Sequence, residues 1–155
     1  MRLRKIAAIA VAGFAAFGVG AGVFAQDMMA DPAIADMSVE QLVEVRQDTM
    51  KQNGGIMKGA GGLSGADAVA AAETLHQNFI NFTAMFPEGS IADDSKALPV
   101  IWEDKEAFDA LFMQAAELAG QMKSAAESGD MDAFGAAAKQ IGGLCGQCHQ
   151  KYRAS

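Results

Sequence analysis

Apolar residues recur along most of this chain at the three- and four-residue spacing of amphipathic α-helices. The first such segment follows Ser38, which forms a capping box with Gln41 three residues later. This helix is expected to stop near Asn53 or to continue to about Lys58, and a glycine-rich connection follows it. No alternating pattern of any length predicts a β-strand.

Three further helical segments follow. Ser64 is expected to cap the second helix, which Pro87 ends. The third helix is expected from about Glu103 to Ser128, and Asp130 can cap the fourth. Four amphipathic helices with short connections predict an all-α fold, an antiparallel four-helix bundle. The apolar stripes of the four helices, most of which we expect in the core, are Val39, Leu42, Val43 and Met50 on the first, Val69, Ala72, Leu75, Phe79, Phe82 and Phe86 on the second, Phe108, Leu111, Phe112, Ala115, Leu118 and Met122 on the third, and Met131, Phe134, Ile141, Leu144, Cys148 and Tyr152 on the fourth.

The first 25 residues have a different pattern. Three basic residues lie within the first five positions, and an apolar run covers residues 6–24. The small residue Ala25 ends this stretch, with the small branched Val23 two positions before it. This pattern is typical of a cleaved secretory signal peptide, so we expect a domain of residues 26–155 located in the periplasm. An uncleaved membrane anchor is the alternative, because the run is close to spanning length. Its many glycines and alanines make it only weakly hydrophobic, which favours cleavage and leaves no membrane anchor afterwards.

Removal of the first 25 residues leaves an acidic chain. They hold three of the twelve Lys and Arg residues and none of the nineteen Asp and Glu residues, so the remaining net charge is 9 − 19 = −10. Such a surface repels phosphate backbones, which argues against a nucleic-acid partner. It would instead steer the protein toward basic surfaces of partner proteins.

Both cysteines lie in one motif, Cys145-Gly146-Gln147-Cys148-His149, close to the end of the chain. C-x-x-C-H is the attachment pattern of c-type haem. On a helix, side chains three and four positions apart share one face. Two thiols can therefore add to the two vinyl groups on one side of a porphyrin, while the imidazole reaches the iron. The motif predicts one covalently attached haem c with His149 as an axial ligand.

Three other uses of these cysteines are less consistent with the sequence. A thioredoxin-like motif accompanies a βαβ pattern, and no strand is expected here. A structural zinc site takes four ligands, and beyond the motif the chain offers only a distant His76, which we expect at the surface or its boundary. A plain disulfide would close a very short loop and leave His149 without a role.

The motif and several other stretches together resemble the class II c-type cytochromes, the cytochrome c′ and cytochrome c-556 family. The resemblance spans nearly all of residues 37–153, and the glycine-rich connection is a few residues shorter than is usual in that family. The stretches that carry it are Arg46-Gln47, Met50 to Gly54, Ile101 to Lys105 with Phe108, and Cys145 to Arg153.

The resemblance implies roles for three residues of the first helix. Arg46 and Gln47 would lie at a haem propionate, where the guanidinium can form a charge-assisted hydrogen bond. Met50 would be the sixth iron ligand, as in the c-556 branch, since the run from Met50 to Gly54 is similar to that branch. In the c′ branch the corresponding side chain only crowds an open iron site, which is the alternative.

These expectations rank three functions. An electron carrier comes first, because a six-coordinate iron has little to do but change its oxidation state. A binder of small diatomic gases such as nitric oxide or carbon monoxide comes second and requires an open sixth position. An enzyme such as a peroxidase is disfavoured, because the expected distal wall of Met50, Phe79 and Phe82 offers no polar group.

Redox proteins are the expected partners, and the first two helices could pair two copies in a homodimer, as in many relatives.

Overall fold

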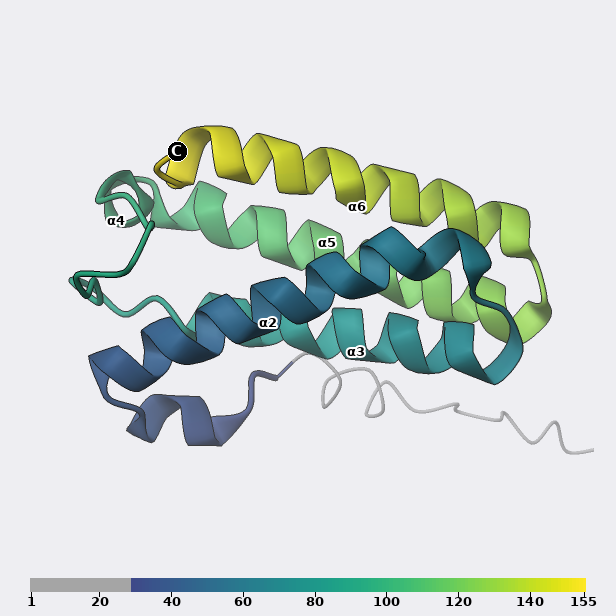
Figure 1. The fold of residues 1–155 in the computed structure, drawn as a ribbon, viewed down its shortest axis with the longest axis horizontal. Helices are drawn as coiled ribbons and strands as arrows, with labels where there is room; N and C mark the ends of the chain where they lie inside the picture. Colours follow the sequence, from purple (N-terminus) through teal and green to yellow (C-terminus); the bar gives the residue numbers. More distant parts are fainter. Residues whose placement is uncertain (1–28) are drawn as a thin grey trace, which may run out of the picture.

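Four long helices lie side by side along the longest axis of the molecule (Figure 1). The computed structural model describes residues 29–155, and in that part of the chain it contains no strand longer than a single bridge. This arrangement confirms the predicted all-α four-helix bundle. The elements in chain order are η1 (Pro32–Asp36), α2 (Val39–Gly59), η2 (Ala60–Gly62), α3 (Gly65–Ala84), α4 (Val100–Glu103), α5 (Lys105–Ser128) and α6 (Met131–Tyr152).

The capping box at the start of α2 is present. The main-chain N–H of Ser38 donates to Gln41 Oε1 over 2.8 Å, and the N–H of Gln41 donates to Ser38 Oγ over 3.3 Å. The helix then continues to Gly59, the longer of the two expected ends. Ser64 is the N-cap residue of α3, as expected, but its side chain makes no capping hydrogen bond.

The expected third helix is α5, which begins two residues later than expected and ends at Ser128 as expected, and a short helix, α4, precedes it. Asp104 leaves the helical conformation, with φ −133° and ψ 41°, and separates the four-residue α4 from α5. Gly129 ends α5 with φ 76°, a left-handed conformation that suits glycine. Asp130 caps α6 as expected, because its Oδ1 accepts a hydrogen bond from Ala133 N over 2.9 Å.

The helices differ in how extensively they pack against one another. α3 packs along α5, and α5 packs along α6, whereas α2 makes its main helix contact with α3. A cluster of aromatic rings fills one end of the bundle, with centroids of neighbouring rings 4.8–6.3 Å apart. Its members are Phe82, Phe86, Phe108, Phe112 and Tyr152.

Residues 85–99 form the connection between α3 and α4, and they tie two distant helices together. Ala97 forms an antiparallel bridge with Arg153, just after α6, and main-chain hydrogen bonds of 3.0 and 2.8 Å flank it. At the other side, the Nε2 amide of Gln47 on α2 donates to Asp94 Oδ2 over 3.3 Å. This 85–99 connection therefore links α2 to the end of α6.

The predicted signal peptide, residues 1–25, lies outside the described residues. Within residues 29–155, every helix is too short or too polar to cross a membrane.

Candidate functional site

The last turns of α6 carry Cys145, Cys148 and His149. The two cysteines are half-buried and are not bonded to each other. Burial raises the pKa of the Cys145 thiol, and burial raises the pKa of Cys148 to about 11, so both thiols are protonated at neutral pH. Burial, followed by the charge of Arg153, lowers the pKa of His149. Its imidazole is therefore neutral at pH 7 and keeps a lone pair for a metal ion.

Two adjoining cavities lie between α2 and α6. The larger has a volume of about 520 Å³ and the smaller about 260 Å³. Together they are in the range of sites that hold a cofactor-sized ligand. The residues that line both cavities are Met50, Phe112, Cys148 and His149. The motif on α6 therefore faces Met50 of α2 where the two cavities meet.

Aromatic rings form the inner wall of the larger cavity. All five members of the aromatic cluster line it, and the rings of Phe82 and Phe112 are stacked with an interplanar angle of 8°. Such a wall is apolar and offers flat surfaces, which suits a planar macrocycle and keeps water away from it.

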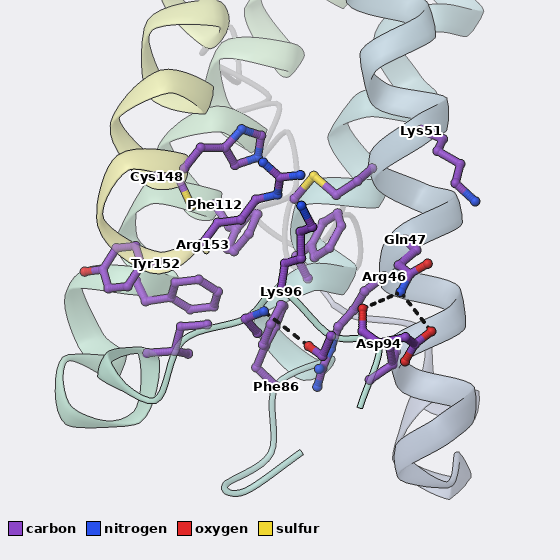
Figure 2. Close-up of a pocket in the computed structure, with 18 residues that line it drawn as sticks. Arg46, Gln47, Lys51, Phe86, Asp94, Lys96, Phe112, Cys148, Tyr152 and Arg153 are labelled. Atoms are coloured by element: carbon purple, nitrogen blue, oxygen red, sulfur yellow. Dashed lines mark hydrogen bonds between the residues drawn. The ribbon is translucent and has the colours of Figure 1, made fainter. Parts of the chain in front are cut away.

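Cations gather at the mouth of the larger cavity. Lys96 and Arg153 line it, and among the residues described Asp94 is the one carboxylate in its lining. Lys51 also lines it, but its amino group points away from the space and pairs with Asp48 over 2.8 Å (Figure 2). Figure 2 shows Lys96 and Arg153 reaching toward the centre of the space from the 85–99 connection and from the end of α6. This excess of positive charge in an acidic protein fits a ligand that carries carboxylates. Lys96 was not singled out from the sequence, because its position depends on the bridge beside it.

Arg46 lines the same cavity, but most of its hydrogen bonds go to the 85–99 connection. Its side chain is only 5% exposed, and it donates two hydrogen bonds to the carbonyl of Met85, one to the carbonyl of Ser90 and one to the Ser90 hydroxyl. Its guanidinium also lies 3.9 Å from the centroid of the Phe86 ring. Burial lowers its pKa to about 10, so the group is still charged at neutral pH. These bonds use four of the five N–H groups of an arginine and leave one for a ligand.

Asn53 is a site residue that the sequence analysis missed. It is 5% exposed and lines the smaller cavity together with Met50. The expectation that the distal wall of the iron site holds no polar group was therefore wrong. Of the expected wall residues, Phe79 lines the smaller cavity and Phe82 lines the larger one. The spacing of three residues from Met50 on one helix was the signal that could have revealed it.

His76 lies away from both cavities. Its Nδ1 is 2.8 Å from the carbonyl oxygen of Ala116 on α5, and its half-buried position agrees with the expected boundary location. No group of three or more His, Cys, Asp or Glu side chains within residues 29–155 could hold a metal ion by itself. The zinc alternative therefore has no ligand set in this part of the chain.

These features together fit a haem. The motif supplies two thiols and a neutral imidazole on one face, the cavity wall supplies apolar rings, and the mouth supplies cations for two propionates.

Comparison with known proteins leads to the same family. The family model for cytochrome c′ matches residues 39–153. A cytochrome c-556 of Agrobacterium tumefaciens (strain B2A) is 38% identical over 120 residues, which cover 72% of this chain and 95% of that protein. A cytochrome c′ of Rhodospirillum rubrum is 32% identical, covering 72% of this chain and 81% of that protein.

The solved structures agree on the fold. The crystal structure of cytochrome c′ from Thermochromatium tepidum superimposes with a TM-score of 0.70 at 24% identity, covering 77% of this chain and 99% of that one. The family model spans nearly the whole described domain, and two relatives exceed 30% identity over more than two thirds of the chain. This chain therefore belongs to the cytochrome c′ family of helical-bundle proteins, which carry one covalently attached c-type haem.

Proposed function

We propose that this protein is an electron carrier of the c-556 kind, in which His149 and Met50 bind the haem iron from opposite faces. Cys145 and Cys148 would form the two thioether bonds. One observation carries the proposal: Met50 and His149 stand on different helices and both line the two cavities where these meet. Phe112 and Cys148 share that position, but a phenyl ring has no lone pair to donate, and Cys148 is used for attachment.

The bound haem supplies a one-electron change between ferric and ferrous iron. The chain supplies the conditions for that change. A thioether and a neutral imidazole are held on separate helices, and this pair raises the reduction potential relative to a second nitrogen or oxygen ligand. The aromatic cluster keeps water from the inner face. Because both ligands stay in place, little has to move when the electron is transferred.

The propionates would lie at the mouth of the larger cavity. Arg46 can offer its one remaining N–H there, and Gln47, which already donates to Asp94, stands beside it. Lys96 and Arg153 add positive charge from two other segments. The carboxylates would thus be bound by groups that also connect α2 with the 85–99 connection.

We also propose that residues 1–25 direct export to the periplasm and are removed there. The acidic surface would favour redox partners with a basic docking face. A homodimer is part of the proposal, and one solved member of the family is described as a dimer whose dissociation is controlled by ligand.

The second candidate function is the binding of nitric oxide or carbon monoxide at a five-coordinate iron. Its support is that Met50 is only half-buried and stands beside open space, and that relatives include cytochromes c′ as well as c-556. In that case Met50 would shield the iron without binding it.

Absorption spectra of the ferric and ferrous protein separate the two functions. We expect low-spin iron in both states, and high-spin iron that binds carbon monoxide readily in Met50→Ala. Met57→Ala is the matched control, because Met57 also lines the smaller cavity, and its spectra should equal those of the wild type. A high-spin wild type in which Met50→Ala changes only the rate of gas entry would instead assign the protein to gas binding.

A further inference from the structure

One buried donor near the proposed iron site has no partner within the described part of the chain. The Nδ2 atom of Asn53 is buried, and no hydrogen-bond acceptor is in reach. Buried polar groups are almost always paired, so an unpaired one requires a reason, such as a group that the bare chain lacks.

The orientation of this amide is determined by its neighbours. Asn78 Nδ2 donates to Asn53 Oδ1 over 2.7 Å and also donates to Gln52 Oε1 over 2.8 Å. Asn78 thereby uses both of its amide hydrogens, and Asn53 must present its oxygen to Asn78. The two N–H groups of Asn53 are then left for another acceptor.

Sulfur-containing side chains line the smaller cavity together with Asn53. Asn53 stands three residues after Met50 on α2, so the two side chains are neighbours on one helix face. Both line the smaller cavity, as do Met57, Cys148 and His149. Haem attachment would use the sulfur of Cys148, and the iron would use the imidazole of His149. The thioether sulfur of a methionine is a weak hydrogen-bond acceptor, even when it binds a metal.

We infer that Asn53 is a positioning residue of the iron site: its side-chain amide, aligned by Asn78, donates a hydrogen bond to the sulfur of the iron-bound Met50. The inference rests on the proposed His149/Met50 ligation. Ligation of the iron by Met50 would hold this sulfur in one place, beside the unpaired nitrogen of Asn53.

Such a bond would act on the reduction potential. An N–H donor withdraws electron density from the sulfur and makes it a poorer donor to ferric iron. The ferrous form is then favoured, in the way that hydrogen bonds around a ligand tune other metal sites. Removal of the amide should therefore shift the equilibrium toward the ferric form.

Replacement of Asn53 by leucine in the holoprotein tests this inference. At a fixed solution potential, we expect the ferric-to-ferrous ratio of Asn53→Leu to rise about threefold to tenfold, the effect of one ordinary hydrogen bond. A tenfold change corresponds to 59 mV for a one-electron couple. The iron should stay low-spin, and the NMR signal of the Met50 methyl group should move. Gln77→Leu is the matched control, since it removes an exposed side-chain amide of α3 that lines neither cavity and donates to Asn81, and it should leave the ratio unchanged.

A second measurement does not depend on the folding of an Asn53 variant. In the ¹⁵N-labelled ferric wild type, the side-chain NH₂ of Asn53 should give signals displaced by the iron, and these should persist in Met57→Leu. Loss of those signals in Met57→Leu would assign the acceptor to Met57 and overturn the inference.

The remaining outcomes separate the inference from the function on which it rests. A high-spin wild type would overturn both. A low-spin wild type with an unchanged ferric-to-ferrous ratio in Asn53→Leu would overturn the role of Asn53 alone. This holds even if the variant is less stable, because an amide that only supports the fold, or that is paired with water, affects stability and leaves the ratio unchanged.

Discussion

Replacement of Arg46 by methionine is expected to be among the most costly single changes in this bundle. Methionine keeps part of the aliphatic volume and removes all five donors. The carbonyls of Met85 and Ser90 and the Ser90 hydroxyl would then be left without this donor, and both residues are at most 2% exposed. The 85–99 connection begins at this point, so its attachment to α2 would be weakened.

The magnitude follows from those contacts. Each buried acceptor that loses its partner costs about 1–3 kcal/mol, and the contact of the guanidinium with Phe86 adds on the order of 1 kcal/mol. With two carbonyls and the ring contact affected, we expect the free energy of unfolding of the holoprotein to fall by about 3–7 kcal/mol. Urea titration followed by far-ultraviolet circular dichroism measures this difference, with an unchanged slope showing that two-state unfolding is retained.

Lys51→Met is the matched control for Arg46→Met. Lys51 lies on the same helix and pairs with Asp48 over 2.8 Å, with both side chains more than 60% exposed. Surface ion pairs contribute little, so the control should lose less than about 1 kcal/mol. If Arg46→Met lost no more than Lys51→Met, the reasoning would be refuted, and Arg46 would have to act mainly on the cofactor.

Two further changes test the anchoring of α6. Cys148→Ala should greatly reduce the yield of haem-loaded protein, because one thioether is lost and the apolar walls then surround a space; a normal yield of loaded protein, measured by the haem-to-protein absorbance ratio, would contradict this. Asp104 accepts hydrogen bonds from Lys151 and the Tyr152 hydroxyl, which lower its pKa. This stabilisation is present above the carboxyl's unfolded pKa and is lost as the pH falls through its lower folded pKa, so Asp104→Asn should lower the urea midpoint at pH 7 and match the wild type in strong acid. Equal midpoints at pH 7 would show that the contacts of Asp104 do not support α6.

Features that depend on neighbouring residues in the sequence were predictable. The capping box of Ser38 and Gln41, the stop at Gly129 and the cap at Asp130 each involve a few consecutive positions, and all are present. The spacing of Cys145, Cys148 and His149 likewise needs only one helix. Such local patterns were sufficient for the bundle and for the centre of the candidate site.

Features set by distant contacts were not predictable in this way. Asn53 looked like a possible helix end, and it is a buried residue only because α3 brings Asn78 against it. Arg46 was expected to face a propionate, whereas the 85–99 connection folds back to occupy most of its donors. The break at Asp104 also has no local signal, since that residue is bound by the far end of α6.

The 85–99 connection and the weak direct packing of α2 have a consequence for how the protein assembles. α3, α5 and α6 pack along one another, while α2 is joined to them mainly through α3 and this connection. α3, α5 and α6 can thus form a packed three-helix unit, and α2 would cover one side of it when the cofactor is bound. Any bond from Met50 to the iron then helps to hold a whole helix. Loss of this bond would therefore loosen the docking of α2 as well as open the iron site.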